Sequence, residues 1–365
     1  MKIKSIETYK MSLPLKVPFR TALRVVESME SIVVKVQTDT GHIGWGEAPA
    51  TAVITGDTLP SIAYAIESVI GPQLIGQDVS QLEELMHIIQ TSMAHNTSPK
   101  AALDMAVYDL FAQSQNTPLY KLLGGYTNTI ETDITISLNP VDVMIEDSLR
   151  AVAAGYHILK IKVGSSYHDD VDRIIKISDE LPDDIKIRID ANQGWSPKTA
   201  VRVIKTLEEL GVEMELVEQP VKADDIEGLD LVTKSVDTPI LADEAVFSRR
   251  DAKRLLDIRA ADFINIKLMK TGGIHSAIDI CSLALSHLIP CMMGCMLEGG
   301  IAATAAAHFA CAKRNIIYVD IDGPLLASTN PVKGGAVFGQ PYIQLSEAAG
   351  LGIEDVEGLV RYKVE

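Results

Sequence analysis

Four polar residues stand at the ends of short apolar stretches of the kind that form β-strands. Asp190, Glu218, Asp243 and Lys267 belong to the stretches KIRIDAN, ELVEQP, PILADEA and FINIKLM, and successive members lie 28, 25 and 24 residues apart. Carboxylates can hold a metal ion and an amine can move a proton, so these residues could act together if they met. A strand, a crossover helix and two loops need about this length, which predicts repeated β/α units.

The same spacing continues in both directions along the chain. Thr135, Lys162, Cys295 and Asp320 extend the series at intervals of 25 to 28 residues, which makes eight expected strand ends. In a β/α barrel the carboxyl ends of the strands share one rim, and enzymes with this fold keep their active sites there. The sequence therefore predicts an α/β fold, a TIM-type (β/α)8 barrel, and an enzyme.

Helix signals separate the expected strands from Glu131 onward, as parallel β/α units require. Side chains that cap helices, prolines that start them and glycines that end them occur at the expected places. The expected starts are Asn139-Pro140, Ser196-Pro197, Ser248 with Asp251, and Gly272-Gly273, and the expected ends are Gly155 and Gly211.

The first 125 residues follow another pattern. KIKSIETYKMSLPL, SIVVKVQTDT and HIGWGEA read as antiparallel strands, and apolar residues recur at helical spacing between Leu59 and Leu123. We therefore expect an N-terminal α+β capping domain at 1–125 and a catalytic barrel at 126–347. Residues 348–365 are expected to fold back on the capping domain.

Composition limits the partners. The 365 residues carry a net charge of −16, which opposes binding to nucleic acid or to anionic membranes. The N-terminus lacks the apolar core of a secretory signal, and the four cysteines form no C-x-x-C pair. We expect a soluble, cytoplasmic homo-oligomer whose partner is a small-molecule substrate.

Asp190, Glu218 and Asp243 end three adjacent expected strands and could converge. Hard oxygen ligands without histidine or thiolate suit Mg²⁺ better than zinc. The alternative is three unrelated carboxylates at helix starts, where each would interact favourably with a helix dipole.

Lys162 and Lys267 fall four positions apart in a ring of eight strands, so they should face each other. One could then remove a proton from a carbon while the other delivers a proton to its opposite face. For this work a lysine needs a lowered pKa, through burial or through a cation such as Lys160, which points the same way as Lys162. The alternatives are solvated rim lysines or a Schiff-base lysine.

Other polar residues near the strand ends leave their roles open. Asp320 and Asp322 share a face and could clasp a substrate ammonium group or cap a helix. Cys295 has no histidine partner in the expected barrel, so its backbone is the better candidate for a contact. His275 and His308 read as packing or helix-surface residues rather than catalysts.

Five motifs occur in order at barrel spacing: KIK at 160–162, DANQGW at 190–195, VEQP at 217–220, ADE at 242–244 and NIKLMKTGG at 265–273. With them the chain resembles the enolase superfamily, and within it the dipeptide epimerases of the muconate-lactonizing-enzyme subgroup. The resemblance implies a modified (β/α)7β barrel, one Mg²⁺ per subunit on Asp190, Glu218 and Asp243, and catalytic Lys162 and Lys267.

The implied reaction is epimerisation of the C-terminal residue of L-Ala-D/L-Glu, a murein peptide fragment. It proceeds by a two-lysine 1,1-proton transfer through an enediolate, with Lys162 serving the R form and Lys267 the S form. The resemblance implies substrate contacts at Arg24, Thr135, Lys160, Cys295, Met296, Leu297, Asp320, Ile321 and Asp322.

Other functions stay open at this point. A sister enzyme of the subgroup could be an N-acylamino acid racemase, an o-succinylbenzoate synthase or a cycloisomerase, and none of these needs an acidic pair facing an ammonium group. An epimerase for hydrophobic dipeptides would not need Arg24, which could instead be a surface residue of a hairpin. A barrel that only binds a ligand would not need the two lysines.

Overall fold

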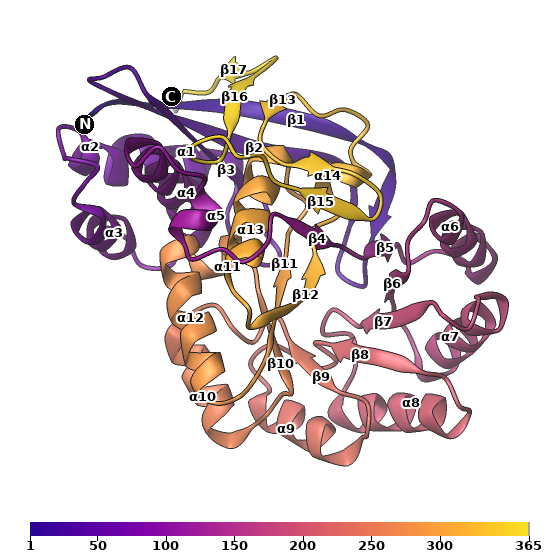
Figure 1. Ribbon diagram of the computed structural model, residues 1–365. Helices are drawn as coiled ribbons and strands as arrows, with labels where there is room; N and C mark the ends of the chain where they lie inside the picture. The colour runs from indigo at the N-terminus through magenta and orange to yellow at the C-terminus, as the bar shows by residue number, and fades with distance from the viewer. Residues whose placement is uncertain (364–365) are drawn as a thin grey trace.

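The computed structural model describes residues 1–363 and contains an eight-stranded parallel sheet that curls into a barrel (Figure 1). Each strand pairs with the next one along the chain. The barrel strands are β5(Ile134–Ile136), β6(Ile158–Lys162), β7(Lys186–Asp190), β8(Met214–Glu218), β9(Ile240–Ala242), β10(Phe263–Ile266), β11(Cys291–Gly294) and β12(Ile316–Asp320). The gap between β12 and β5 is bridged by Asp133, whose amide donates to the carbonyl of Val319 at 3.3 Å.

Seven crossover helices connect the eight strands, so the (β/α)7β form of the barrel is confirmed. They are α6(Val141–Ala153), α7(Tyr167–Glu180), α8(Pro197–Glu209), α9(Ile226–Ser235), α10(Arg249–Ile258), α12(Ile274–Ser286) and α13(Gly300–Ala312). The short helices α11(Leu268–Thr271) and α14(Gly323–Leu326) follow β10 and β12. Ser196 and Ser248 cap α8 and α10 as predicted, whereas Pro140 rather than Asn139 takes the N-cap position of α6.

The N-terminal module is an antiparallel sheet packed on helices. Its strands are β1(Ile3–Arg20), β2(Val25–Thr38) and β3(Ile43–Pro49). Its helices are α1(Leu59–Tyr64), the π-helix η1(Ala65–Ile70), α2(Gly71–Leu74), α3(Leu82–Thr91), α4(Thr97–Ser114) and α5(Leu119–Leu122). Helix α4 lies directly against β3, and a Cβ at Gly46 would come within 1.9 Å of the Ala102 carbonyl. Only glycine allows this approach.

The segment after the barrel returns to both modules. β4(Thr129–Glu131) pairs with β15(Tyr342–Gln344), which also pairs with β14(Val337–Phe338). β13(Val332–Gly334) pairs with β16(Ile353–Val356). β17(Val360–Arg361) then joins the edge of the N-terminal sheet beside β1 (Figure 1).

Within residues 1–363 there is no helix with the length and apolar character needed to cross a bilayer. The stretch free of charged residues from Cys281 to Leu297 forms the end of α12 and the buried strand β11.

Candidate active site

The carboxyl ends of the barrel strands open into a cavity lined by side chains of the barrel and of the N-terminal module. Two loops of the N-terminal module form part of its wall. The end of β1 contributes Phe19, the β1–β2 turn contributes Leu23 and Arg24, and the loop after β3 contributes Val53 and Ile54. Loops carry no periodic sequence signal, so the second loop could not be found from the sequence.

The three predicted metal ligands are buried side by side. Asp190 and Glu218 are fully buried, Asp243 is 2% exposed, and all three follow adjacent strands. The next helices, α8, α9 and α10, begin at least six residues later, so these carboxylates are not helix caps.

The three predicted site lysines are also buried, with 2% exposure for Lys160, 5% for Lys162 and 6% for Lys267. Solvated rim lysines are therefore excluded. Lys162 Nζ lies 2.6 Å from Asp190 Oδ2, and Lys267 Nζ lies 2.8 Å from Asp243 Oδ2. Three strands separate β6 from β10 in either direction around the ring, so the two amines approach the cavity from opposite sides.

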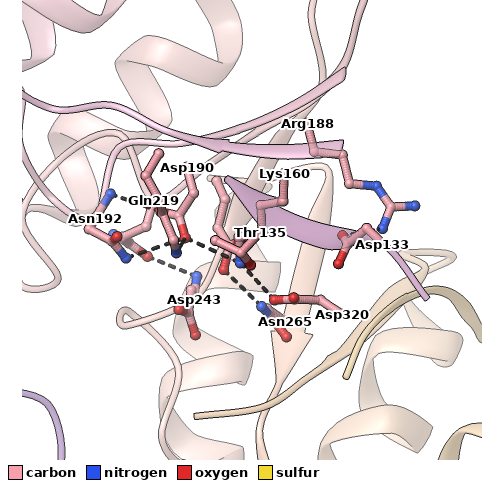
Figure 2. A network of polar contacts seen from close by, with 12 residues as sticks. Asp133, Thr135, Lys160, Arg188, Asp190, Asn192, Gln219, Asp243, Asn265 and Asp320 are labelled. Atoms are coloured by element: carbon pink, nitrogen blue, oxygen red, sulfur yellow. Dashed lines mark hydrogen bonds and ion pairs between the residues drawn. The ribbon is translucent and has the colours of Figure 1, made fainter. Parts of the chain in front are cut away.

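Lys160 contacts two of the predicted metal ligands and the acidic residue that ends β12. Its Nζ is 2.7 Å from Asp320 Oδ2, 2.7 Å from Glu218 Oε2 and 3.2 Å from Asp190 Oδ2. Figure 2 shows Lys160 together with Asp190 and Asp320, and the ion pair of Arg188 and Asp133 lies beside them.

The acidic pair after β12 faces the cavity rather than a helix. Asp322 Oδ2 accepts a hydrogen bond from the Thr135 amide at 2.8 Å, and its side chain does not cap α14. Asp320 and Asp322 line the cavity with Thr135, so the helix-cap interpretation is wrong.

The remaining predicted contacts divide into two groups. Arg24, Cys295, Met296 and Leu297 line the cavity. Ile321 is fully buried and is not part of the cavity wall, and its amide donates to Thr132 Oγ1 at 2.9 Å. Ile321 thus differs from its acidic neighbours in lying outside the cavity wall, and its contact with a substrate stays a prediction.

The buried charges shift one another's pKa. Burial raises the pKa of Glu218 to about 7 and that of Glu244 to about 8, and neighbouring Asp190 and Asp243 add to these shifts. Burial opposes ionisation of Asp243, but Lys267 and Lys270 bring its pKa below the ordinary value.

Lys267 does not have the lowered pKa that the sequence analysis expects. Burial lowers its pKa, but the carboxylates of Asp243, Glu218 and Asp320 together outweigh burial, and the pKa of Lys267 lies above its ordinary value.

Several residues support the site without reaching into it, and sequence reasoning missed them. Gln219 Oε1 accepts from the amides of Asp243 at 2.8 Å and Ala245 at 3.2 Å. Asn265 Nδ2 donates to Glu218 Oε1 at 2.8 Å. Gln219 lies in VEQP and Asn265 in NIK, so the motifs were visible, but these bonds cross between strands and have no local signal.

The donor set fits a divalent cation. As the side chains lie, no three acidic, cysteine or histidine groups in residues 1–363 are close enough to share a metal, because lysines stand between them. Lys160 lies 2.7 Å from Glu218 Oε2, and Lys270 lies 2.6 Å from Asp243 Oδ1. Each of these two buried carboxylate oxygens is thus paired with a lysine amine.

The charge balance of the site points the same way. Six buried acids outnumber four buried lysines, so carboxyl groups are in excess among the buried ionisable side chains of the site. The acids are Asp190, Glu218, Asp243, Glu244, Asp320 and Asp322, and the lysines are Lys160, Lys162, Lys267 and Lys270.

Comparison with known families agrees with this geometry. Residues 4–124 match the N-terminal domain of the mandelate racemase / muconate lactonizing enzyme family, and residues 144–357 match the enolase C-terminal domain-like family. The chain belongs to the enolase superfamily. The family resemblance and the fold class drawn from the sequence are therefore confirmed.

Individual members of the superfamily are closely similar to this chain. An L-Ala-D/L-Glu epimerase of Clostridium acetobutylicum is 49% identical over 356 residues, which cover 98% of this chain and 99% of that protein. The substrate-liganded L-Ala-D/L-Glu epimerase from Bacillus subtilis superposes with a TM-score of 0.97 at 46% identity, over 98% of this chain and 99% of that one.

A third relative differs in its ligand. The dipeptide epimerase from Enterococcus faecalis, complexed with Mg and L-Leu-L-Tyr, superposes with a TM-score of 0.94 at 42% identity, over 97% of this chain and 100% of that one. The chain is thus an isomerase of the racemase and epimerase class.

Proposed function

We propose that this isomerase is a Mg²⁺-dependent dipeptide epimerase that inverts the α-carbon of the C-terminal residue, with L-Ala-D/L-Glu as substrate. The observation that carries the proposal is the pair of buried amines, Lys162 and Lys267, at the ends of opposite strands of one cavity. The similarity to dipeptide epimerases over nearly the whole chain supports it.

Inversion by a 1,1-proton transfer requires a base on one face of the carbon and an acid on the other. The neutral lysine takes the α-proton, and the bonding electrons move into the C-terminal carboxylate to give an enediolate. The opposite lysine, charged at that moment, gives its proton to the other face. By family resemblance Lys162 serves the R form and Lys267 the S form.

Asp190, Glu218 and Asp243 would hold one Mg²⁺ per subunit. When bound, the ion would supply positive charge that stabilises the negative charge developing on the substrate carboxylate. The oxygen-only donor set and the surplus of carboxylates support this assignment.

The remaining groups would orient the dipeptide. Asp320 and Asp322 would clasp the free α-ammonium, which fits their position in the wall beside Thr135. Arg24 would meet an anionic side chain of the substrate from the covering loop. Lys160 and the segment 295–297 would complete the contacts.

Epimerisation of hydrophobic dipeptides is a second candidate, because Phe19, Leu23, Val53, Ile54 and Leu297 line the same cavity. These side chains could take an apolar residue if Arg24 turned away. The acidic pair after β12 disfavours an N-acylamino acid racemase, whose substrate has no ammonium group for it to bind.

A library of L,L-dipeptides incubated in D₂O with Mg²⁺ and analysed by mass spectrometry tests the proposal. We expect deuterium at the α-carbon of the C-terminal residue of L-Ala-L-Glu, loss of exchange after EDTA treatment, and recovery on adding Mg²⁺. Exchange of hydrophobic dipeptides alone would favour the second candidate. A lack of exchange with every dipeptide would overturn the proposed function.

A further inference from the structure

The crossover helix that follows Lys267 has its N-terminus capped by another domain. Helix α12 begins after Gly273 and has no capping side chain of its own. The carboxylate of Asp104, on α4 of the N-terminal module, accepts hydrogen bonds from the amides of Ile274 at 2.6 Å and His275 at 3.2 Å. Asp104 is fully buried. These bonds satisfy two amides that the helix itself leaves without partners.

Gly273 makes room for that carboxylate. Its φ is +117°, and a Cβ there would lie 2.2 Å from Cγ of Asp104. The Gly272-Gly273 pair therefore serves the docking of α4 as well as the start of the helix. A second side chain of the N-terminal module, Gln90 of α3, donates to the Gly272 carbonyl at 2.7 Å.

A short rigid connection links this contact to Lys267. The carbonyl of Lys267 accepts from the amides of Lys270 at 2.9 Å and Thr271 at 3.1 Å, and the carbonyl of Leu268 accepts from Gly273 at 3.0 Å. The segment 267–273 is thus one hydrogen-bonded turn between the strand end and the capped amides. Gly272 and Gly273 are both held in this turn by hydrogen bonds of their amides to the Leu268 carbonyl, so a displacement at Ile274 would pass to Lys267.

We propose that Asp104 is a positioning residue that sets the reach of Lys267 towards the substrate α-carbon. The inference rests on the proposed two-lysine reaction. It means that the N-terminal module, which also carries Arg24, controls the acid–base group on one face of the substrate. A shift of about 1 Å in a reacting group can lower a rate about 100-fold, so hydrogen bonds that fix this turn should affect the rate of proton transfer by Lys267.

The loop that follows Lys162 is also fixed by a buried carboxylate, and in this case the carboxylate belongs to the barrel itself. Asp170 of α7 is fully buried, and its carboxylate accepts from the amides of Gly164 at 3.1 Å and Ser165 at 2.9 Å and from Trp195 Nε1 at 2.9 Å. Asp170→Asn is therefore a matched variant for the opposite face.

Replacing another buried carboxylate tests whether a weaker contact between the two modules is by itself enough to change the relative exchange rates of the two isomers. Glu47 of β3 accepts from the amides of Gly299 at 2.7 Å and Ala302 at 3.1 Å at the start of α13. It crosses between the modules as Asp104 does, but its helix follows β11, which carries no lysine of the proposed pair. Glu47→Gln should weaken docking without favouring one face of the substrate.

The test compares α-hydrogen exchange in D₂O for L-Ala-L-Glu and L-Ala-D-Glu, each with Mg²⁺, by NMR. Inversion needs both lysines, whereas exchange without inversion needs only the lysine on that face. We expect Asp104→Asn to change the ratio of the two exchange rates about tenfold or more, by slowing the isomer that Lys267 deprotonates. Asp170→Asn should change the ratio in the opposite direction, and Glu47→Gln should leave it within about twofold of wild type.

The outcomes separate this inference from the proposed function. If wild type exchanges both isomers but Asp104→Asn slows them equally, Asp104 is not a positioning residue for Lys267. If wild type exchanges neither isomer, the proposed function itself fails. Should Asp104→Asn not fold, Gln90→Ala decides the question, because loss of its bond to Gly272 should shift the ratio in the same direction, and an unchanged ratio would overturn the inference.

Discussion

Arg24 brings a positive charge to the rim of the active-site cavity from the N-terminal module. Burial lowers the pKa of its guanidinium, and the side chain forms no ion pair with any group in residues 1–363. A partly buried cation without a protein partner is a candidate for binding an anionic part of the substrate.

Replacing Arg24 tests this role. A hydrogen bond to a charged group contributes roughly 1.5–3 kcal/mol, so Arg24→Ala should lower kcat/KM for L-Ala-L-Glu by about 10- to 100-fold. The same variant should leave kcat/KM for L-Ala-L-Leu within about threefold, because an apolar side chain makes no such bond. Steady-state assays with both dipeptides measure these values, and an equal loss of kcat/KM for both would contradict the role of Arg24.

At this scale, residues that reach into the cavity were easier to predict than those that act through the backbone. Asp190, Glu218, Asp243, Lys162 and Lys267 could be found because strand ends repeat at barrel spacing. Gln219 and Lys270 stabilise a neighbouring strand end by contacts that depend on which strands are adjacent. Ile321 is grouped with the acidic pair by the resemblance alone, and it is fully buried and does not line the cavity.

At the scale of helices and strands, the two modules meet at the N-termini of two barrel helices. Helices α12 and α13 start with glycine pairs instead of capping side chains, and carboxylates from α4 and β3 supply the caps. The sequence marks Gly272-Gly273 as a helix start, but it cannot name Asp104 as the cap, because 170 residues separate Asp104 from Ile274. The lack of a capping side chain next to Gly273 is the local feature of the sequence that indicates a cap from another element.

Gly273→Ala tests this docking. The substitution places a Cβ 2.2 Å from Asp104 Cγ at a positive φ, so it should destabilise the fold by about 2–4 kcal/mol through overpacking and backbone strain. Gly155→Ala is the control, because φ is +95° there and nothing lies within 4 Å of its Cβ position. It should cost about 1 kcal/mol. Urea unfolding measures both, and equal losses would mean that the contact with Asp104 is unimportant.

At the scale of the whole molecule, His308 links the barrel to the N-terminal module. It lies on α13, is 1% exposed, and its Nδ1 accepts a hydrogen bond from the Tyr120 amide at 2.9 Å. Burial lowers the pKa of His308 to about 3. Of the packing and helix-surface roles expected for His308, its burial fits the packing role. The expected cytoplasmic location and homo-oligomeric state stay predictions.

His308 should make the folded state sensitive to acid. In the unfolded chain histidine takes up a proton below about pH 6.5, whereas the folded protein keeps His308 neutral down to about pH 3. Its contribution is present above pH 6.5 and is lost as the pH falls towards 3. Urea unfolding from pH 7.5 to 4 should show a smaller loss of stability for His308→Asn, which keeps an acceptor for Tyr120, than for wild type. Parallel pH curves would refute the assignment.

Exchange of each isomer in the two single-lysine variants tests the central claim most directly. With L-Ala-L-Glu and L-Ala-D-Glu in D₂O, Lys162→Ala and Lys267→Ala should each lower epimerisation by about 100- to 10,000-fold. Each variant should still exchange the α-hydrogen of one isomer, and the retained isomer should differ between the two. Epimerisation that survives in either variant, or retention of the same isomer in both, would contradict a reaction carried out by two amines on opposite faces.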